Sequence, residues 1–194
     1  MIPDSFWRWP AEYGNSLGPA SKEIGQVLSR GALAPFLSTS AGNLAEYICL
    51  VAREWDVTPW WCVISAQREQ SAIENREIST SALNAIMGYV GLDSGREILP
   101  GYYGLYPQIY RSLSQISWYL NFRVDPRQGK TTPRFKPGVS LSVSTQVAGN
   151  LDTHWTPGTA SEYAQLAYTP HLPVLDENET LAVKYCPRFL EVKP

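Results

Sequence analysis

The stretch Thr58–Ile73, TPWWCVISAQREQSAI, predicts a central helix with a carboxylate on its apolar face. Thr58 suits the N-cap, and Pro59 suits the first turn, where its missing N–H leaves no hydrogen bond unmade. Four residues then recur at spacings of four, three and four, which is the rhythm of one helix face: Cys62, Ala66, Glu69 and Ile73.

Glu69 therefore falls where the pattern predicts core. If its neighbours exclude water, desolvation disfavours the charged carboxylate and raises its pKa, which suits a general acid working near neutral pH. The alternative is that Gln-Arg-Glu-Gln forms the polar end of the helix and that Glu69 faces solvent, as charged residues usually do.

Length and composition predict one globular domain over residues 1–194, with residues 1–20 as an irregular N-terminal arm. Hydrophobic residues make up 44% of the chain and charged residues only 18%, a globular balance. Seven Trp, eleven Tyr and five Phe suit a large rigid core, or a groove that stacks flat ligands such as sugar rings.

Charge and cysteine usage exclude several classes of function. A net charge of -2 without a Lys/Arg run gives no case for nucleic-acid binding. The three cysteines, Cys49, Cys62 and Cys186, lack zinc-site spacing, so we expect no metal and no cofactor. We interpret Cys49 and Cys62 as small buried hydrophobes, and one disulfide stays open.

No targeting or membrane-spanning segment is visible in the sequence. No apolar run reaches the roughly 18–20 residues needed to cross a bilayer. The N-terminus, MIPDSFWRWPAEYG, lacks the basic start and apolar core of a secretory signal. We expect synthesis in the cytoplasm, with an export signal absent from this sequence or another route out. The oligomeric state stays open.

Helical periodicity dominates the remaining chain and predicts an all-α fold. Gly- and Tyr-rich segments at 88–95 and 101–107 are expected as loops that approach a ligand, or as structural loops. A Pro-rich basic stretch at 124–142 is expected as an excursion or short hairpin. Further helices are predicted over residues 21–33, 40–55, 80–87, 107–120, 143–151, 159–167 and 177–190.

When other kinds of catalytic site are excluded, the side chains that remain are those that a glycosidase uses. The chain has no G-x-S-x-G elbow and no phosphate-binding loop, and its only histidines are His154 and His171. A nucleophilic Cys62 with His171 is a minor alternative, because Cys62 has no electropositive neighbours in the sequence. Carboxylates, aromatic rings and amides remain.

Four segments in order carry a resemblance to a known family: Gln67–Ser71 (QREQS), Gly88–Asp93 (GYVGLD), Tyr102–Ile109 (YYGLYPQI) and Tyr168–His171 (YTPH). They resemble the lysozyme-like superfamily of peptidoglycan hydrolases and lytic transglycosylases. Within that superfamily the chain resembles more closely a set of bacterial cell-wall-associated, glucosaminidase-like proteins with "QKEQS", "GYG..D", "YYGFxxQI" and "YTPH". The resemblance spans roughly residues 55 to 190.

The resemblance implies a lysozyme-like single domain that cleaves the glycan of peptidoglycan without metal or cofactor. Glu69 would protonate the glycosidic oxygen, and Gln108 would line the groove. Tyr168 would lie near Glu69 and help to position the reacting sugar, while Tyr103 and Tyr106 would contact sugar rings. Which bond is cleaved, and whether by hydrolysis or transglycosylation, stays open.

Three positions qualify what the resemblance implies. Asp93 is the best candidate for a second carboxylate, although an Asp before Ser-Gly is also typical of a simple turn. The loop before Gln108 is one residue longer than the family's Gly-Leu-Met-Gln. Arg68 replaces the usual Lys, on what we expect to be a solvent-facing side of the helix.

A second class of function competes with the enzyme. A non-catalytic glycan-binding, structural or effector domain on the same scaffold would keep the aromatic groove and tolerate loss of the acid. If the enzyme interpretation is right, the missing export signal fits a phage-encoded lysin or virion-borne lysozyme that acts at the cell wall.

Overall fold

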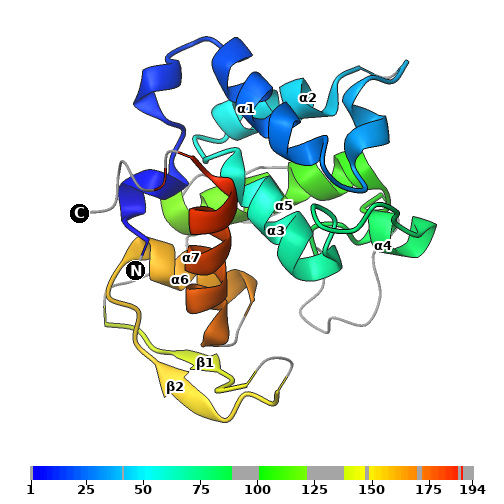
Figure 1. The fold of residues 1–194 in the computed structure, drawn as a ribbon. Helices are drawn as coiled ribbons and strands as arrows, with labels where there is room; N and C mark the ends of the chain where they lie inside the picture. The colour runs from blue at the N-terminus through cyan, green and yellow to red at the C-terminus, as the bar shows by residue number, and fades with distance from the viewer. Residues whose placement is uncertain are drawn as a thin grey trace. The chain divides into compact units, whose positions relative to one another are not determined.

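The protein is mainly helical. The computed structural model describes residues 2–40, 42–88, 101–121, 138–146, 149–169, 172–187 and 189. Helices account for 58% of the described residues and strands for 6%, with one two-stranded sheet (Figure 1). This confirms the predicted mainly helical class, while the lysozyme-like fold itself stays a prediction.

The chain separates into two compact units. One is Trp9–Leu113; the other combines Met1–Arg8 with Ser114–Pro194. We call them the 9–113 unit and the 114–194 unit. The long helix α5 (Leu105–Asn121) supplies residues to both. That the chain is a single domain stays a prediction.

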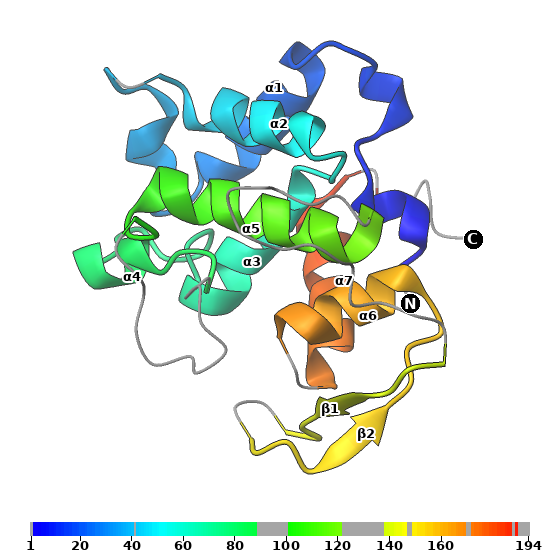
Figure 2. The same ribbon diagram turned by 180° about the vertical axis from the view of Figure 1, so that it is seen from behind.

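Helices build the 9–113 unit. Helices α1 and α2 lie side by side in both views (Figures 1 and 2), as their contacts require. The described elements are η2 (Ala11–Tyr13), α1 (Gly18–Leu28), η3 (Ala34–Leu37), α2 (Leu44–Glu54), α3 (Trp60–Gln70), α4 (Thr80–Asn84) and the first half of α5. The helix predicted over 21–33 thus begins at Gly18 and ends at Leu28.

Helix α3 is buried on every side over most of its length. All residues from Trp60 to Gln67 are buried, so the single apolar face predicted from the sequence is only part of its surface in the core. A helix that is buried all round has no amphipathic stripe to align its neighbours, which explains why periodicity alone described it poorly.

The predicted Thr58 cap is wrong. The N-cap position is Pro59, and no side chain caps the helix. Thr58 is completely buried, and its hydroxyl has no hydrogen-bond partner among the described residues. Helix α3 begins instead with backbone bonds, from Trp61 N–H to Thr58 O at 3.2 Å and from Cys62 N–H to Pro59 O at 3.1 Å.

The 114–194 unit contains a hairpin and two helices. Its elements are η1 (Asp4–Trp7), the second half of α5, β1 (Leu141–Val143), β2 (Thr153–Trp155), α6 (Ala160–Tyr168) and α7 (Pro173–Tyr185). Val143, Leu166 and Val174 form a fully buried cluster between the hairpin and these two helices. Asn178 Nδ2 donates to Gln165 Oε1 at 2.9 Å, so this buried amide pair joins α7 to α6.

The helix predicted over residues 143–151 is wrong. Strand β1 pairs antiparallel with β2, with Leu141 opposite Trp155 and Val143 opposite Thr153. The sequence Val-Ser-Leu-Ser-Val-Ser over residues 139–144 alternates apolar and polar side chains, which is the period of a strand. The hairpin expected within 124–142 therefore lies further along the chain, and residues 122–137 are outside the described part.

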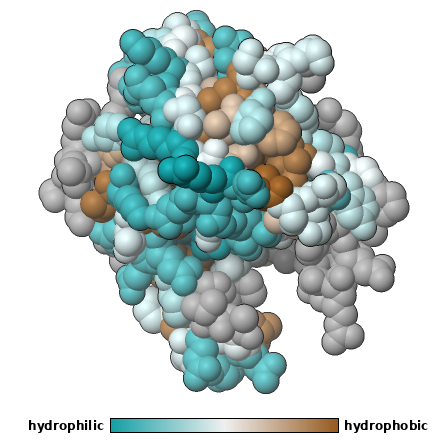
Figure 3. All heavy atoms as spheres, turned by 45° about the vertical axis from the view of Figure 1, so that its right-hand side comes forward, coloured by the Kyte–Doolittle hydropathy of each residue, from teal (hydrophilic) through white to brown (hydrophobic). Residues whose placement is uncertain are grey.

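Apolar side chains that reach the surface come from several elements. Figure 3 shows hydrophobic residues in small groups among hydrophilic ones on one face. The large apolar side chains that are exposed among the described residues are Leu50, Tyr103, Val139, Leu151, Trp155 and Val183. Within the described ranges, every helix is too short or too polar to cross a bilayer.

A capping substitution tests the start of α2. Asn43 Oδ1 accepts the N–H groups of Ala45 at 2.9 Å and Glu46 at 3.3 Å. Asn43→Ala leaves these donors without that acceptor, so we expect the free energy of unfolding to fall by about 1 kcal/mol. Denaturant unfolding measures the loss. Asn75→Ala, at an exposed position, is the control and changes stability by less than about 0.5 kcal/mol; equal losses would contradict the capping role.

Candidate functional site

The C-terminal end of α3 is built by a left-handed residue. Ser71 has φ 50°, which ends the helix after Gln70 and turns the chain so that Ala72 N–H returns to Ala66 O at 3.2 Å. Gln67 Oε1 accepts the next two N–H groups, those of Ile73 at 3.0 Å and Glu74 at 3.2 Å. The polar QREQS segment is thus a fixed helix end and not a frayed one.

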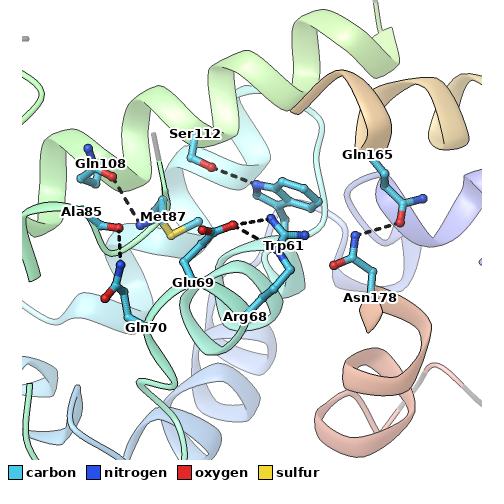
Figure 4. Close-up of polar contacts among 10 residues, drawn as sticks. All are labelled: Trp61, Arg68, Glu69, Gln70, Ala85, Met87, Gln108, Ser112, Gln165 and Asn178. Atoms are coloured by element: carbon cyan, nitrogen blue, oxygen red, sulfur yellow. Dashed lines mark hydrogen bonds and ion pairs between the residues drawn. The ribbon is translucent and has the colours of Figure 1, made fainter. Parts of the chain in front are cut away.

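Glu69 is half-buried at this end. Its side chain is 26% exposed, whereas the residues from Trp60 to Gln67 are buried. Arg68 Nε and Nη2 both donate to Glu69 Oε1, at 3.1 Å and 2.9 Å (Figure 4). Among the described residues, Glu69 Oε2 has no hydrogen-bond partner. One carboxylate oxygen is therefore fixed and the other is open to a further interaction.

Arg68 does not face solvent, and that prediction is wrong. Its side chain is only 7% exposed. The guanidinium carbon lies 5.7 Å from the centroid of the Trp61 ring, within the range of a cation–π contact. Stacking on Trp61 and pairing with Glu69 together hold the guanidinium beside the helix.

Trp61 is itself held from another helix. Its indole Nε1 donates to Ser112 Oγ of α5 at 2.9 Å, in a hydrogen bond that is fully buried. Figure 4 shows the resulting order of contacts, from Ser112 through Trp61 and Arg68 to Glu69. The sequence analysis missed this set, although Trp61 and Arg68 are seven residues apart and so share a helix face.

Gly88 brings backbone against the Glu69 carboxylate. A Cβ placed on Gly88 would lie 2.6 Å from Glu69 Cδ and 2.7 Å from Oε2. Gly88 also has φ +63°, a left-handed conformation that side chains rarely adopt. The segment was expected to approach a ligand or to be a structural loop; at Gly88 its backbone approaches the Glu69 carboxylate, and its remaining residues lie outside the described part.

Gln108 is buried and bridges two parts of the backbone. It is 0% exposed. Its Oε1 accepts Met87 N–H at 3.3 Å, and its Nε2 donates to Tyr102 O at 2.9 Å. The described contacts thus give Gln108 the role of holding Met87, next to Gly88, and Tyr102 in place. They offer no surface for the predicted lining of a groove, because no part of the side chain reaches solvent.

The three predicted tyrosines differ in how exposed they are and in the unit to which they belong. Tyr103 is 51% exposed, in the same unit as Glu69. Tyr106 packs edge-on against Tyr47 with ring centroids 4.8 Å apart, and its hydroxyl is buried. Tyr168 is half-buried at the end of α6 and belongs to the 114–194 unit, and its place near Glu69 stays a prediction. Asp93 lies outside the described residues.

The cysteines are structural. Cys49, Cys62 and Cys186 are buried with free thiols, so no disulfide links them. Burial raises the pKa of the Cys49 thiol to about 12 and that of Cys62 well above its ordinary value. Both thiols are therefore protonated at neutral pH, which argues against a nucleophilic Cys62; the suggested partner, His171, lies outside the described residues.

The described residues contain no group of three His, Cys, Asp or Glu side chains that could hold a metal ion. The chain matches no protein-family model, no curated protein and no solved structure.

Gly88→Ala tests the approach of backbone to Glu69. We expect it to destabilise the protein by about 2–4 kcal/mol, because left-handed strain and a collision with the carboxylate add together. Gly101→Ala is the matched control: Gly101 has φ +88° but open space around it, so it carries the strain alone, about 1 kcal/mol. Denaturant unfolding compares the two, and equal losses would show that the collision is relieved at no cost.

Gln108→Leu tests the bridge between Met87 and Tyr102. Leu fills similar space but leaves a buried N–H and C=O without their partner, so we expect a loss of about 1–3 kcal/mol in the free energy of unfolding. Gln26→Leu, at an exposed position of α1, is the control and changes stability by less than about 0.5 kcal/mol. A Gln108→Leu variant as stable as the wild type would show that the hydrogen bonds of Gln108 to Met87 and Tyr102 do not stabilise the fold.

Proposed function

We propose that this chain cleaves the glycan strand of peptidoglycan with Glu69 as general acid, as a muramidase, a glucosaminidase or a lytic transglycosylase. The supporting observation is the environment of Glu69. It is a half-buried carboxylate on a fixed helix end, with Oε1 bound by Arg68 and Oε2 beside the bare backbone of Gly88. The proposal also rests on the motif resemblance, of which the QREQS segment contains this residue.

The open oxygen defines the chemistry. A proton on Glu69 Oε2 passes to the glycosidic oxygen as the bond from that oxygen to the anomeric carbon breaks and oxocarbenium character develops on the sugar. In hydrolysis, water adds to the anomeric carbon and its proton returns to the carboxylate. In transglycosylation, a hydroxyl of the same strand replaces the water.

Aromatic residues of the same unit suit a sugar ligand. Tyr103 is 51% exposed just before α5, and aromatic rings bind the apolar faces of sugars. Gln108 connects this segment to Met87, which precedes Gly88, so the exposed tyrosine and the acid belong to one hydrogen-bonded set of segments. This supports a polymeric sugar as substrate more than a small charged metabolite.

Glu69→Gln tests the acid. The amide keeps an acceptor oxygen for Arg68, so we expect the variant to fold with a melting temperature within a few degrees of the wild type. Release of soluble muropeptides from purified peptidoglycan should fall by at least about 100-fold, the scale of general-acid catalysis. Glu77→Gln, which removes an exposed carboxylate from the same unit, is the control and keeps full activity.

Two outcomes would contradict the proposal, each in a different part. A wild-type protein that releases no muropeptides between acidic and mildly alkaline pH would favour the non-catalytic glycan-binding domain, which a peptidoglycan pull-down would then detect. A Glu69→Gln variant with full activity would keep the enzyme but remove Glu69 as its acid. Mass spectrometry of the released products distinguishes a muramidase, a glucosaminidase and a transglycosylase.

A further inference from the structure

We infer that the β1–β2 hairpin is a sugar-binding surface of the 114–194 unit, on which the exposed indole ring of Trp155 stacks against a sugar ring of an uncharged glycan. The class of ligand follows from the chemistry of the hairpin. That this glycan is the strand of peptidoglycan rests on the proposed function.

Trp155 is the exception among the tryptophans of this chain. Five of the seven are buried and Trp9 is half-buried, whereas Trp155 is 40% exposed. Its indole N–H has no hydrogen-bond partner within the described part of the chain. Trp has a large apolar surface, so an indole left in water loses a stabilisation that a ligand on its ring would restore.

The apolar face of the hairpin is covered at one end only. Leu141 pairs with Trp155 across the two strands, so their side chains share a face of the sheet. Val143, two residues along β1, lies on the same face and is fully buried against residues of α6 and α7. The face thus begins as core at Val143 and reaches solvent at Trp155. Val139, just before β1, is 45% exposed and adds apolar surface to the same segment.

Strand β2 is the accessible strand of the pair. The contacts with the helices come from β1 and the residue after it, since Leu141 packs on the buried cluster and Ser144 O accepts Leu172 N–H at 2.8 Å. On β2, His154 and Trp155 are both exposed. Both ribbon views show the hairpin extending beyond α6 and α7 (Figures 1 and 2). A ligand as long as a sugar chain can therefore lie along β2.

The opposite face of the hairpin carries groups that suit sugar hydroxyls. Ser140 Oγ and Thr156 Oγ1 lie 2.6 Å apart, and Ser142 Oγ and His154 Nε2 lie 3.4 Å apart. All four side chains are exposed. Hydroxyl groups both donate and accept hydrogen bonds, as sugar hydroxyls do. His154 and Thr156 adjoin Trp155 along the chain, so a ligand at β2 meets an aromatic ring and hydrogen-bonding groups together.

The charge of the hairpin favours an uncharged ligand. Residues 138–158 contain one carboxylate, Asp152, and no Lys or Arg. That carboxylate accepts Thr145 N–H at 2.9 Å and the Thr145 hydroxyl at 2.8 Å, so it is bound within the hairpin. Nucleic acids and anionic membranes are bound through basic side chains, which this surface lacks. A sugar ring presents apolar C–H groups to an aromatic ring and needs no counter-charge.

Substitutions of Trp155 separate ring stacking from general hydrophobic contact. Trp155→Leu keeps an apolar side chain but has no aromatic face, and Trp155→Ala serves in its place if the Leu variant fails to fold. Trp155→Tyr keeps a ring that can stack and hydrogen-bond. Leu151→Ala is the matched control, because it removes apolar surface that is 58% exposed from another position of the same hairpin.

The first measurement is binding of the full chain to insoluble peptidoglycan, by co-sedimentation. It uses a Glu69→Gln background so that the glycan is not cleaved. We expect Trp155→Leu to raise the Kd by at least about tenfold, the scale of uncovering part of a Trp side chain. Trp155→Tyr and Leu151→Ala should stay within about threefold of the parent, because a stacking ring remains in both.

The second measurement is an NMR titration of the indole N–H groups with chitohexaose, a soluble oligomer of N-acetylglucosamine. The Trp155 signal is identified by its absence from Trp155→Tyr, and we expect it to shift as the oligomer binds. Phosphatidylcholine vesicles are the comparison ligand. A signal that moves with vesicles and not with chitohexaose would replace the sugar by a lipid surface and contradict the inference.

The outcomes distinguish this inference from the proposed function. An active wild type whose peptidoglycan binding is unchanged in Trp155→Leu and Trp155→Ala would overturn the inference and keep the enzyme. A wild type that releases no muropeptides but binds the glycan through Trp155 would overturn the enzyme and support the inference. Equal losses in Leu151→Ala and Trp155→Leu would show apolar contact without ring stacking and would also refute it.

Discussion

The burial of α3 on all of its sides is the constraint on which the 9–113 unit depends. A helix in that position cannot present a polar end to water by chance, because its neighbours enclose it up to Gln67. The last turn must therefore satisfy its own polar groups. Gln67 does so for the following backbone, and Arg68 does so for Glu69. The half-exposed carboxylate is where this enclosure ends.

The same enclosure explains why charge and aromatic rings occur together here. A guanidinium that leaves water needs a partner carboxylate or a ring face to recover the lost hydration, and Arg68 has both, in Glu69 and Trp61. The indole then needs an acceptor for its N–H, which Ser112 provides. Each contact in this series compensates for the burial of the one before it, so the series behaves as a unit and its members are not interchangeable.

The sequence predicted elements better than it predicted surroundings. The long helix around Ile109 and Leu113 and the helix ending at Tyr168 were recognisable because an amphipathic period marks them. Glu69 was recognisable as an unusual residue for the same reason.

The burial of Arg68 could not be predicted, because two adjacent charged residues are typical of an exposed helix surface. Its stacking on Trp61 depends on which neighbours enclose the helix. The role of Gln108 depends on backbone groups at Met87 and Tyr102, which no side-chain pattern encodes. The hairpin at Leu141 was missed although its alternation is visible, because each strand is only three residues long and its pairing partner lies further along the chain.

The turn at Ser71 has a consequence for how α3 tolerates changes in length. One residue added between Trp60 and Gln67 would rotate everything after it by about 100° around the helix axis and advance it by about 1.5 Å. Glu69 would then leave Gly88, and Arg68 would leave Trp61, while the left-handed Ser71 would direct the following chain elsewhere. Side chains of the helix can be exchanged at many positions. Its number of residues is fixed, because both of its ends must keep their contacts with neighbouring segments.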